Sequence, residues 1–214
     1  MASDEELVFA AHLESIPLTL SFPNPKDERQ REEYRSALNP GASVPTRIVT
    51  NTNGRKLLSA SLLPFWSTLK SDSGSLPAVT SCQRTGAAGL DIITKDVQPP
   101  VDSRVAQRVK EIRGELDEVV FVKGVFQDGL GAYEALFMGT RETRTAGFTV
   151  GSRVTMVDAC LIPAVDQACF YRFGLEFAPN VMEIYDTQKQ TGAFQAADWR
   201  NQPDAPEKYR HKSA

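Results

Sequence analysis

Strand-forming patterns are confined to the first third of this 214-residue chain, and the rest of the sequence reads almost entirely as helix. Residues 46–50 and 55–58 are short runs of β-forming character separated by the turn sequence Asn51-Thr-Asn-Gly54, which predicts a β-hairpin. A further short strand is predicted at 16–22. Capping and apolar patterns predict helices at 3–15, 27–38 and 61–69. The chain is therefore expected to fold as a small α/β unit followed by an all-helical unit.

The second part of the chain carries long helical patterns. Two long helices are predicted at 80–113 and 116–137, and a last helix at 180–190. Pro99 and Pro100 remove two backbone donors from the first of these, so we expect that helix to bend there.

A capping-box pattern joins Thr155 and Asp158 at the start of another helix. Reciprocal capping stabilises a helix end, so we assign both residues to folding and not to chemistry. The stretch 71–77 has the serine, glycine and aspartate content of a linker. We therefore predict two domains, 1–74 and 75–214.

Charge and hydropathy exclude several classes of protein. The chain has 24 Lys and Arg against 27 Asp and Glu, a formal net charge of -3, and so lacks the basic excess typical of nucleic-acid or membrane-surface binding. No apolar run approaches the roughly 18 residues of a membrane span. The acidic start, MASDEELVF, is unlike a signal peptide. We expect a cytoplasmic protein with a small-molecule or protein partner, no nucleic acid and no membrane.

The three cysteines, Cys82, Cys160 and Cys169, show neither CxxC nor metal-ligand spacing. We expect reduced thiols packed in the core of a cytosolic protein. His12 and His211 have no metal-like partners, so no metal site is predicted.

Four segments carry family motifs. Residues 34–45, YRSALNPGASVP, are similar to a segment of glutathione transferases, and 58–63 are similar to the helix start that follows it in that family. Residues 97–100 and 149–163, with the tail 193–206, resemble the zeta class in particular, the maleylacetoacetate isomerase family. This resemblance covers residues 3–206. It implies a thioredoxin-like first domain, an all-helical second domain, glutathione as cofactor with its site between the domains, and a homodimer.

The resemblance also implies which residues bind glutathione. Val44 and Pro45 would form a cis-proline turn whose backbone pairs with the cysteinyl part of the tripeptide. Ser61, at a helix N-terminus, would offer its hydroxyl and N–H to the γ-glutamyl carboxylate, although the same groups serve a simple helix cap. The other implied contacts are Gln30, Gln98, Asp102, Ser103 and Arg104. For Gln98, Asp102 and Arg104, a solvated helix face with contact between Asp102 and Arg104 or Arg108 is the alternative.

The device that activates the thiol is expected to be altered. In the family a first strand leads into a Ser-Ser-Cys loop, whereas Met1, Ala2 and Ser3 align with that loop here, so the first strand is missing and the thioredoxin-like domain is truncated. Ser3 keeps a hydroxyl and is the catalytic candidate, with a helix-capping role as its alternative. The acidic residues 4–6 would raise the pKa of a neighbouring thiol.

The function implied by the resemblance is glutathione-dependent cis-trans isomerisation of a conjugated olefin. We expect the substrate to be a polyketide intermediate of fungal secondary metabolism. The expected substrate contacts are Arg108, Phe126, Tyr133 and Arg172, the last with surface solvation as its alternative. Two other functions stay open: a glutathione-conjugating transferase, and an inactive relative that binds glutathione.

Overall fold

The computed structural model describes residues 83–138, 145–203, 205 and 207–210, together with Val8, Glu32–Glu33, Arg47–Thr50 and Lys56–Ser59. Internal contacts divide the chain into two compact units. One contains Met1–Ala2 and Ala78–Gln195, and the other contains Ser3–Pro77 and Ala196–Ala214. The boundary expected between residues 74 and 75 stays a prediction.

The unit that contains Ser3–Pro77 has two described strands, which form a hairpin. Strand β1 (Arg47–Thr50) pairs antiparallel with β2 (Lys56–Ser59), and Arg47 lies opposite Ser59. This confirms the pairing predicted from the sequence, while the turn residues 51–54 lie outside the described residues. Val8 and Glu32–Glu33 are helical, as expected for the helices predicted there.

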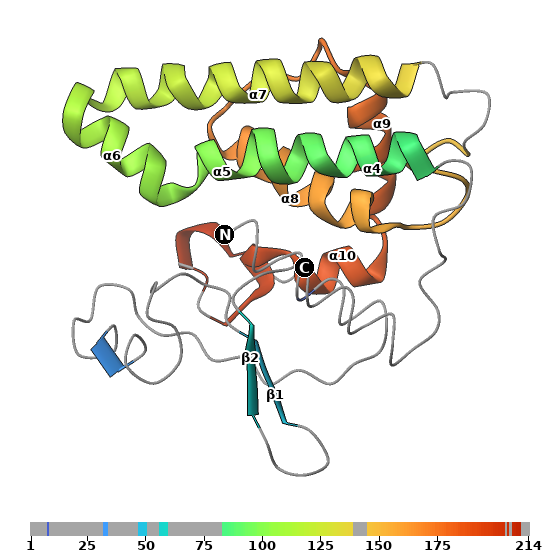
Figure 1. Cartoon of the computed structure of the whole chain (residues 1–214), viewed down its shortest axis with the longest axis horizontal. Coiled ribbons are helices and arrows are strands. Elements are labelled where there is room, and N and C mark those ends of the chain that lie inside the picture. Colours follow the sequence, from blue (N-terminus) through green and yellow to red (C-terminus); the bar gives the residue numbers. More distant parts are fainter. Residues whose placement is uncertain are drawn as a thin grey trace. The chain divides into compact units, whose positions relative to one another are not determined.

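The first long helix of the prediction is a chain of four pieces. They are α4 (Gln83–Asp91), the π-helical segment η1 (Ile92–Val97), α5 (Gln98–Val101) and α6 (Ser103–Arg113). In Figure 1 these pieces follow one another beside α7. The predicted interruption is present, but the backbone leaves the helical region at Asp102, where ψ is 136°, and not at Pro99–Pro100.

Helix α7 (Glu115–Met138) returns along these pieces and confirms the helix predicted at 116–137. Gly114, with φ of 101°, ends α6, and three acidic residues in the first turn of α7 favour its N-terminus electrostatically. Its inner face is an apolar stripe at helical spacing, with five side chains fully buried: Val122, Phe126, Leu130, Tyr133 and Phe137.

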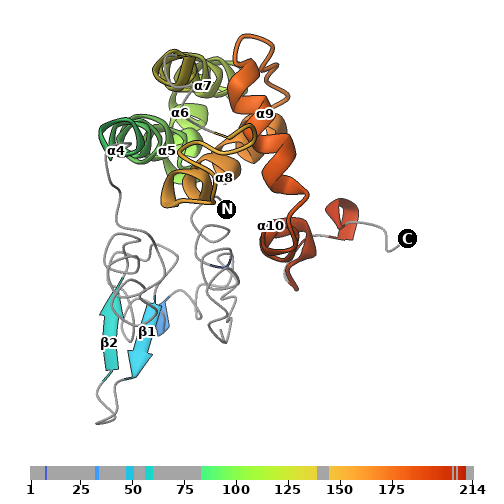
Figure 2. The ribbon, with the colours of Figure 1, turned by 90° about the vertical axis from the view of Figure 1, so that its right-hand side faces the viewer.

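Helix α8 (Met156–Phe170) is buried along most of its length and packs against α4 and α9 (Figure 2). The predicted capping box between Thr155 and Asp158 is confirmed. Cys160 is 2% exposed and lies in the core, as expected, whereas Cys169 is exposed, so the expectation of core packing is wrong for Cys169. Cys82 lies outside the described residues.

Helix α9 (Pro179–Lys189) matches the helix predicted at 180–190. It is not the last helix, because α10 (Gly192–Ala197) follows it, with the 3-10 turns η2 (Trp199–Asn201) and η3 (Glu207–Tyr209) beyond. None of the helices that the structure describes is long and apolar enough to cross a membrane.

Candidate functional site

The described residues expected to bind glutathione lie together, on one short stretch of the helical unit. Gln98 begins α5 and is half-buried, Asp102 stands at the break between α5 and α6, and Ser103 and Arg104 begin α6 and are exposed. Sequence neighbours are necessarily close. What the structure adds is the conformation that this stretch adopts.

Asp102 caps α6. Its Oδ1 accepts the backbone N–H of Arg104 at 2.9 Å and the Nε–H of the same arginine at 3.2 Å. The two side chains are 42% and 64% exposed, so this ion pair is screened by water and contributes little to stability. The contact is one of those weighed against ligand binding, and the binding roles of Asp102 and Arg104 stay predictions.

The adjoining prolines explain the local backbone. Pro99 and Pro100 have no N–H, so a continued α-helix would leave the carbonyls of Lys95 and Asp96 without their usual donors, and the Pro99 ring would press on the preceding turn. The segment η1 widens instead, and the N–H of Gln98 donates to Ile93 O, five residues back. Two prolines in the sequence thus produce a π-helical turn immediately before Gln98.

A residue that the sequence did not single out supports the end of this stretch. Gln167 on α8 donates from Nε2 to the carbonyl oxygen of Val101 at 2.9 Å. Val101 is 1% exposed, so its carbonyl depends on a protein donor. The sequence signal for Gln167 is a polar residue in a mostly apolar helix.

The residues expected to contact the substrate differ in their exposure to solvent. Arg108 and Arg172 are exposed, and Arg172 has a φ of 52° just after α8. Phe126 and Tyr133 are 0% exposed. Tyr133 packs on Phe137 with ring centroids 4.4 Å apart, and its hydroxyl lies 2.9 Å from Thr149 Oγ1.

Those contacts correct one expectation. Phe126 and Tyr133 belong to the apolar stripe of α7, and neither ring has an open face for a ligand. We therefore assign both to core packing and not to a substrate pocket. The spacing of apolar residues along α7 was the sequence signal for this role.

The remaining predicted site residues fall outside the described part of the chain: Ser3, Gln30, Val44, Pro45 and Ser61. Their assignments stay predictions.

Asp158 organises the loop that precedes α8. Its carboxylate accepts the N–H of Thr149 at 2.9 Å, and both the N–H and the hydroxyl of Thr155 at 2.7 Å. The side chain is fully buried. Burial raises the pKa of Asp158 above its ordinary 3.8, against the opposing effect of the hydrogen bonds from Thr149 and Thr155. These bonds serve folding and present no open atom for chemistry.

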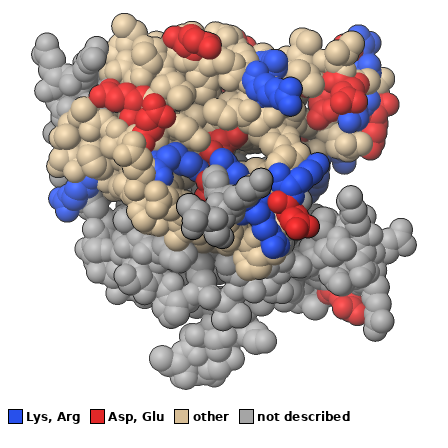
Figure 3. Space-filling model, turned by 180° about the vertical axis from the view of Figure 1, so that it is seen from behind, with Lys and Arg blue, Asp and Glu red and all other residues tan. Residues whose placement is uncertain are grey.

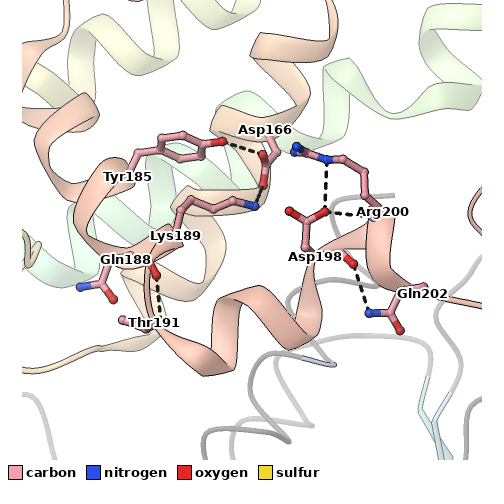
Figure 4. A network of polar contacts seen from close by, with 8 residues as sticks. All are labelled: Asp166, Tyr185, Gln188, Lys189, Thr191, Asp198, Arg200 and Gln202. Carbon is pink, nitrogen blue, oxygen red and sulfur yellow. Dashed lines mark hydrogen bonds and ion pairs between the residues drawn. The ribbon is translucent and has the colours of Figure 1, made fainter. Parts of the chain in front are cut away.

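A second buried carboxylate, Asp166, lies farther along α8. Figure 4 shows it facing two side chains of α9. The Tyr185 hydroxyl donates to Oδ1 at 2.7 Å, and Lys189 Nζ lies 2.7 Å from Oδ2. The Asp166 and Lys189 side chains are only 4% and 18% exposed, so this pair links α8 to α9 as part of the core.

Another carboxylate group in Figure 4 belongs to the other compact unit. Asp198 caps the η2 turn by accepting the N–H of Arg200 at 2.9 Å, and Arg200 Nε lies 3.1 Å from the same oxygen. Gln202 Nε2 donates to Asp198 O at 3.3 Å. These contacts are local to the C-terminal turn.

Charges of both signs are interspersed over the described surface drawn in Figure 3. Within the described ranges no three His, Cys, Asp or Glu side chains gather as metal ligands. What the Gln98–Arg104 stretch offers chemically is one carboxylate, one guanidinium and one amide, a set suited to a small zwitterion with ammonium and carboxylate groups.

Two fungal proteins resemble this chain over nearly its whole length. It is 31% identical over 216 residues to the maleylacetoacetate isomerase maiA of Aspergillus fumigatus, a match covering 97% of this chain and 90% of that protein. It is 30% identical over 224 residues to a probable glutathione S-transferase of Coccidioides immitis, covering 95% of this chain and 91% of that protein. No family model matches the sequence.

Solved structures show the same fold. A bacterial zeta-class glutathione S-transferase, maleyl pyruvate isomerase in its holo form, superposes with a TM-score of 0.83 at 21% identity, covering 96% of each chain. The maleylacetoacetate isomerase of Anaeromyxobacter dehalogenans, with bound dicarboxyethyl glutathione and citrate, gives a TM-score of 0.81 at 21% identity, covering 96% of this chain and 94% of that one. At this level of identity the similarity establishes the fold alone.

Proposed function

Because the chain belongs to the maleylacetoacetate isomerase family of zeta-class glutathione transferases, we propose that it is a glutathione-dependent enzyme that interconverts the cis and trans forms of a conjugated olefin. The observation that carries this proposal is 31% identity to an Aspergillus fumigatus maleylacetoacetate isomerase along 97% of the chain. A second relative of that name, from Emericella nidulans, is 29% identical over 95% of the chain.

The described residues fit glutathione as the cofactor. The tripeptide carries an ammonium group, two carboxylates and two amides. Asp102 suits the ammonium, Arg104 suits a carboxylate, and the Gln98 amide can pair with either a carboxylate or a peptide group. Since Asp102 and Arg104 keep exposed surface while paired with each other, both remain accessible to a ligand.

The remaining binding groups proposed for this chain come from residues outside the described ranges. We assign the backbone of Val44, before Pro45, to the cysteinyl part, and Ser61 to the γ-glutamyl carboxylate. Gln30 and Ser103 complete the polar contacts.

When bound, glutathione supplies a thiolate nucleophile that adds reversibly to a conjugated double bond, which allows rotation before elimination. The protein must hold the sulfur and orient the olefin beside it. Ser3 is the proposed hydroxyl donor near the sulfur. Arg108 and Arg172, both exposed, are proposed to attract acidic or carbonyl oxygens of the substrate. Elimination releases the same thiolate that was added, so the cycle consumes no proton and changes no net charge.

We propose that the substrate differs from maleylacetoacetate and is a polyketide olefin of fungal secondary metabolism. Two differences from the family pattern support this: Met1-Ala2-Ser3 aligns with the Ser-Ser-Cys loop, and Ala60 stands where the family has glutamine before Ser61. We further propose that the protein is a cytoplasmic homodimer, as its resemblance to the family implies.

Glutathione conjugation is the second candidate, since one relative is a probable glutathione S-transferase. Product mass separates the two reactions, because isomerisation leaves the mass unchanged and conjugation adds the tripeptide. An inactive relative would bind glutathione and form neither product.

The test combines binding and product analysis. Calorimetric titration with glutathione is expected to show binding in the micromolar to millimolar range, weakened severalfold by Ser61→Ala and unchanged by Ser152→Ala, an exposed serine of the helical unit. Maleylacetoacetate and a conjugated polyenone are then incubated with and without glutathione, and products are resolved by chromatography and mass. No binding at millimolar glutathione would refute both enzyme functions. Efficient turnover of maleylacetoacetate alone would refute the proposed change of substrate.

A further inference from the structure

The π-helical segment η1 has an unusual position. Residues in π-helices make up well under about 1% of globular proteins, and single π turns often occur at functional sites. Here the segment Ile92–Val97 ends directly before Gln98, the first described residue of the proposed glutathione site. The stretch from Gln98 to Asp102, which we call the binding turn, is therefore displaced relative to an unbroken helix.

The N-terminal end of the binding turn is held by α7. Val97 is 0% exposed, and its Cγ2 occupies the space where a Cβ on Gly129 would stand. Because any larger residue at position 129 would overlap Val97, this contact requires glycine. Gly124, on the same helix, has open space at the corresponding position.

The C-terminal end of the binding turn is held by α8. Gln167 Nε2 donates to Val101 O at 2.9 Å, which satisfies a buried carbonyl just where the helix is interrupted. The next residue, Asp102, adopts φ of -52° and ψ of 136° and caps α6. A five-residue turn is thus fixed at both ends by neighbouring helices.

We propose that Gly129 and Gln167 are positioning residues for glutathione: through Val97 and Val101 they set where the Gln98 amide and the Asp102 carboxylate meet the tripeptide. Neither residue touches the ligand. This inference rests on the proposed function, since it concerns the same cofactor site. It assigns a role to two residues of the helical unit, the buried Gly129 and the part-buried Gln167, that no motif of the sequence pointed to.

Gly129→Ala tests the first contact. The added methyl displaces Val97, so we expect the dissociation constant for glutathione, measured by calorimetry on the full chain, to rise about tenfold, the equivalent of one hydrogen bond to a charged group. In steady-state kinetics KM for glutathione should rise while kcat changes less than twofold, because the reacting atoms are not moved. Gly124→Ala is the matched control and should leave both values unchanged.

A compensating substitution separates positioning from stability. Val97→Ala in the Gly129→Ala background removes the group that the new methyl displaces, so glutathione affinity should return to within about twofold of wild type. The same double variant has one buried methyl group fewer than wild type and should unfold at a lower temperature than wild type. Glutathione affinity would then match wild type while stability stays below it, which a purely structural role for Gly129 does not predict.

Gln167→Met keeps the length of the side chain and removes the donor, and it decides the question if Gly129→Ala does not fold. We expect a severalfold weaker affinity for glutathione with helical circular dichroism retained. Wild-type affinity in folded Gly129→Ala, or in Gln167→Met where the first does not fold, would overturn the inference and leave the proposed function standing. Absence of glutathione binding by the wild type would overturn both.

Discussion

Asp158→Ala removes an acceptor that three donors share. The carboxylate receives the N–H of Thr149 on one oxygen, and the N–H and hydroxyl of Thr155 on the other. Thr149 is 1% exposed, so its N–H cannot turn to water, whereas Thr155 is only partly buried. The substitution therefore leaves one buried donor unsatisfied and removes one of the two reciprocal bonds of the capping box.

The structure gives the size of the effect. Losing the cap costs about 1 kcal/mol, and an unsatisfied buried N–H costs about 1 to 3 kcal/mol. The sum is a loss of about 2 to 4 kcal/mol in the free energy of unfolding, a large share of the roughly 5 to 15 kcal/mol typical of native proteins. For a chain of this size the midpoint of thermal unfolding should fall by about 4 to 16 °C.

The pH dependence of this loss follows from the raised pKa of Asp158. Because burial raises that pKa in the folded state above the ordinary 3.8, the folded protein binds a proton more readily than the unfolded chain. The resulting contribution to stability is fully present below pH 3.8 and is lost as pH rises through the raised pKa. The difference between wild type and Asp158→Ala should therefore shrink from acid toward neutral pH.

Urea unfolding followed by the far-UV circular dichroism of the helices measures both effects, with the fit made at several pH values. Asp186→Ala, an exposed acidic residue on α9, is the control and should change the free energy of unfolding by less than about 0.5 kcal/mol. If Asp158→Ala is as stable as this control at acidic pH, where the contribution of Asp158 is fully present, the assignment of Asp158 to folding is wrong.

Three further predictions concern other contacts of the helical unit. Glu134→Ala removes the carboxylate that accepts the first N–H groups of α9, so the free energy of unfolding should fall by about 2 to 4 kcal/mol, as measured in urea. Lys189→Met removes the ammonium group that lies 2.7 Å from Asp166 Oδ2, so the free energy of unfolding should fall by up to about 3 kcal/mol, which a lower thermal midpoint would show. The pKa of Tyr171 is raised above 10.0, mainly by burial, so the contribution of the neutral Tyr171 hydroxyl to stability is lost as pH rises above 10. When unfolding is measured at increasing alkaline pH, Tyr171→Phe should therefore lose less stability than wild type.

Local signals predicted much of the described secondary structure. The helix at 116–137, the capping box of Thr155 and Asp158, and the hairpin of β1 and β2 each depend on a few neighbouring residues, and each is confirmed. The break was predicted at Pro99–Pro100 but lies at Asp102. The prolines act on the turn before them, while the side chain of Asp102 favours a helix cap two residues later.

Long-range contacts could not be predicted in the same way. Glu134 binds the N-terminus of α9 across 46 residues of sequence, and Gln167 reaches Val101 across 66. Such pairings depend on how helices pack, which a single sequence does not specify. The burial of Phe126 and Tyr133 does follow from a local signal, since their spacing along α7 marks its buried face.

The π-helical segment also determines how this chain tolerates changes in length. Lys95 and Asp96 lie on its exposed side, so deleting either would remove no core side chain. Such a deletion would instead let η1 close into an ordinary α-helix, and α4 would keep its orientation toward α7, because the wider π-helical turn accommodates about one residue more than an α-helical turn does. Gly89 would then still face the rings of Tyr133 and Phe137. The π-helical segment therefore lets this part of the chain lose one residue without changing which face of α4 meets the core.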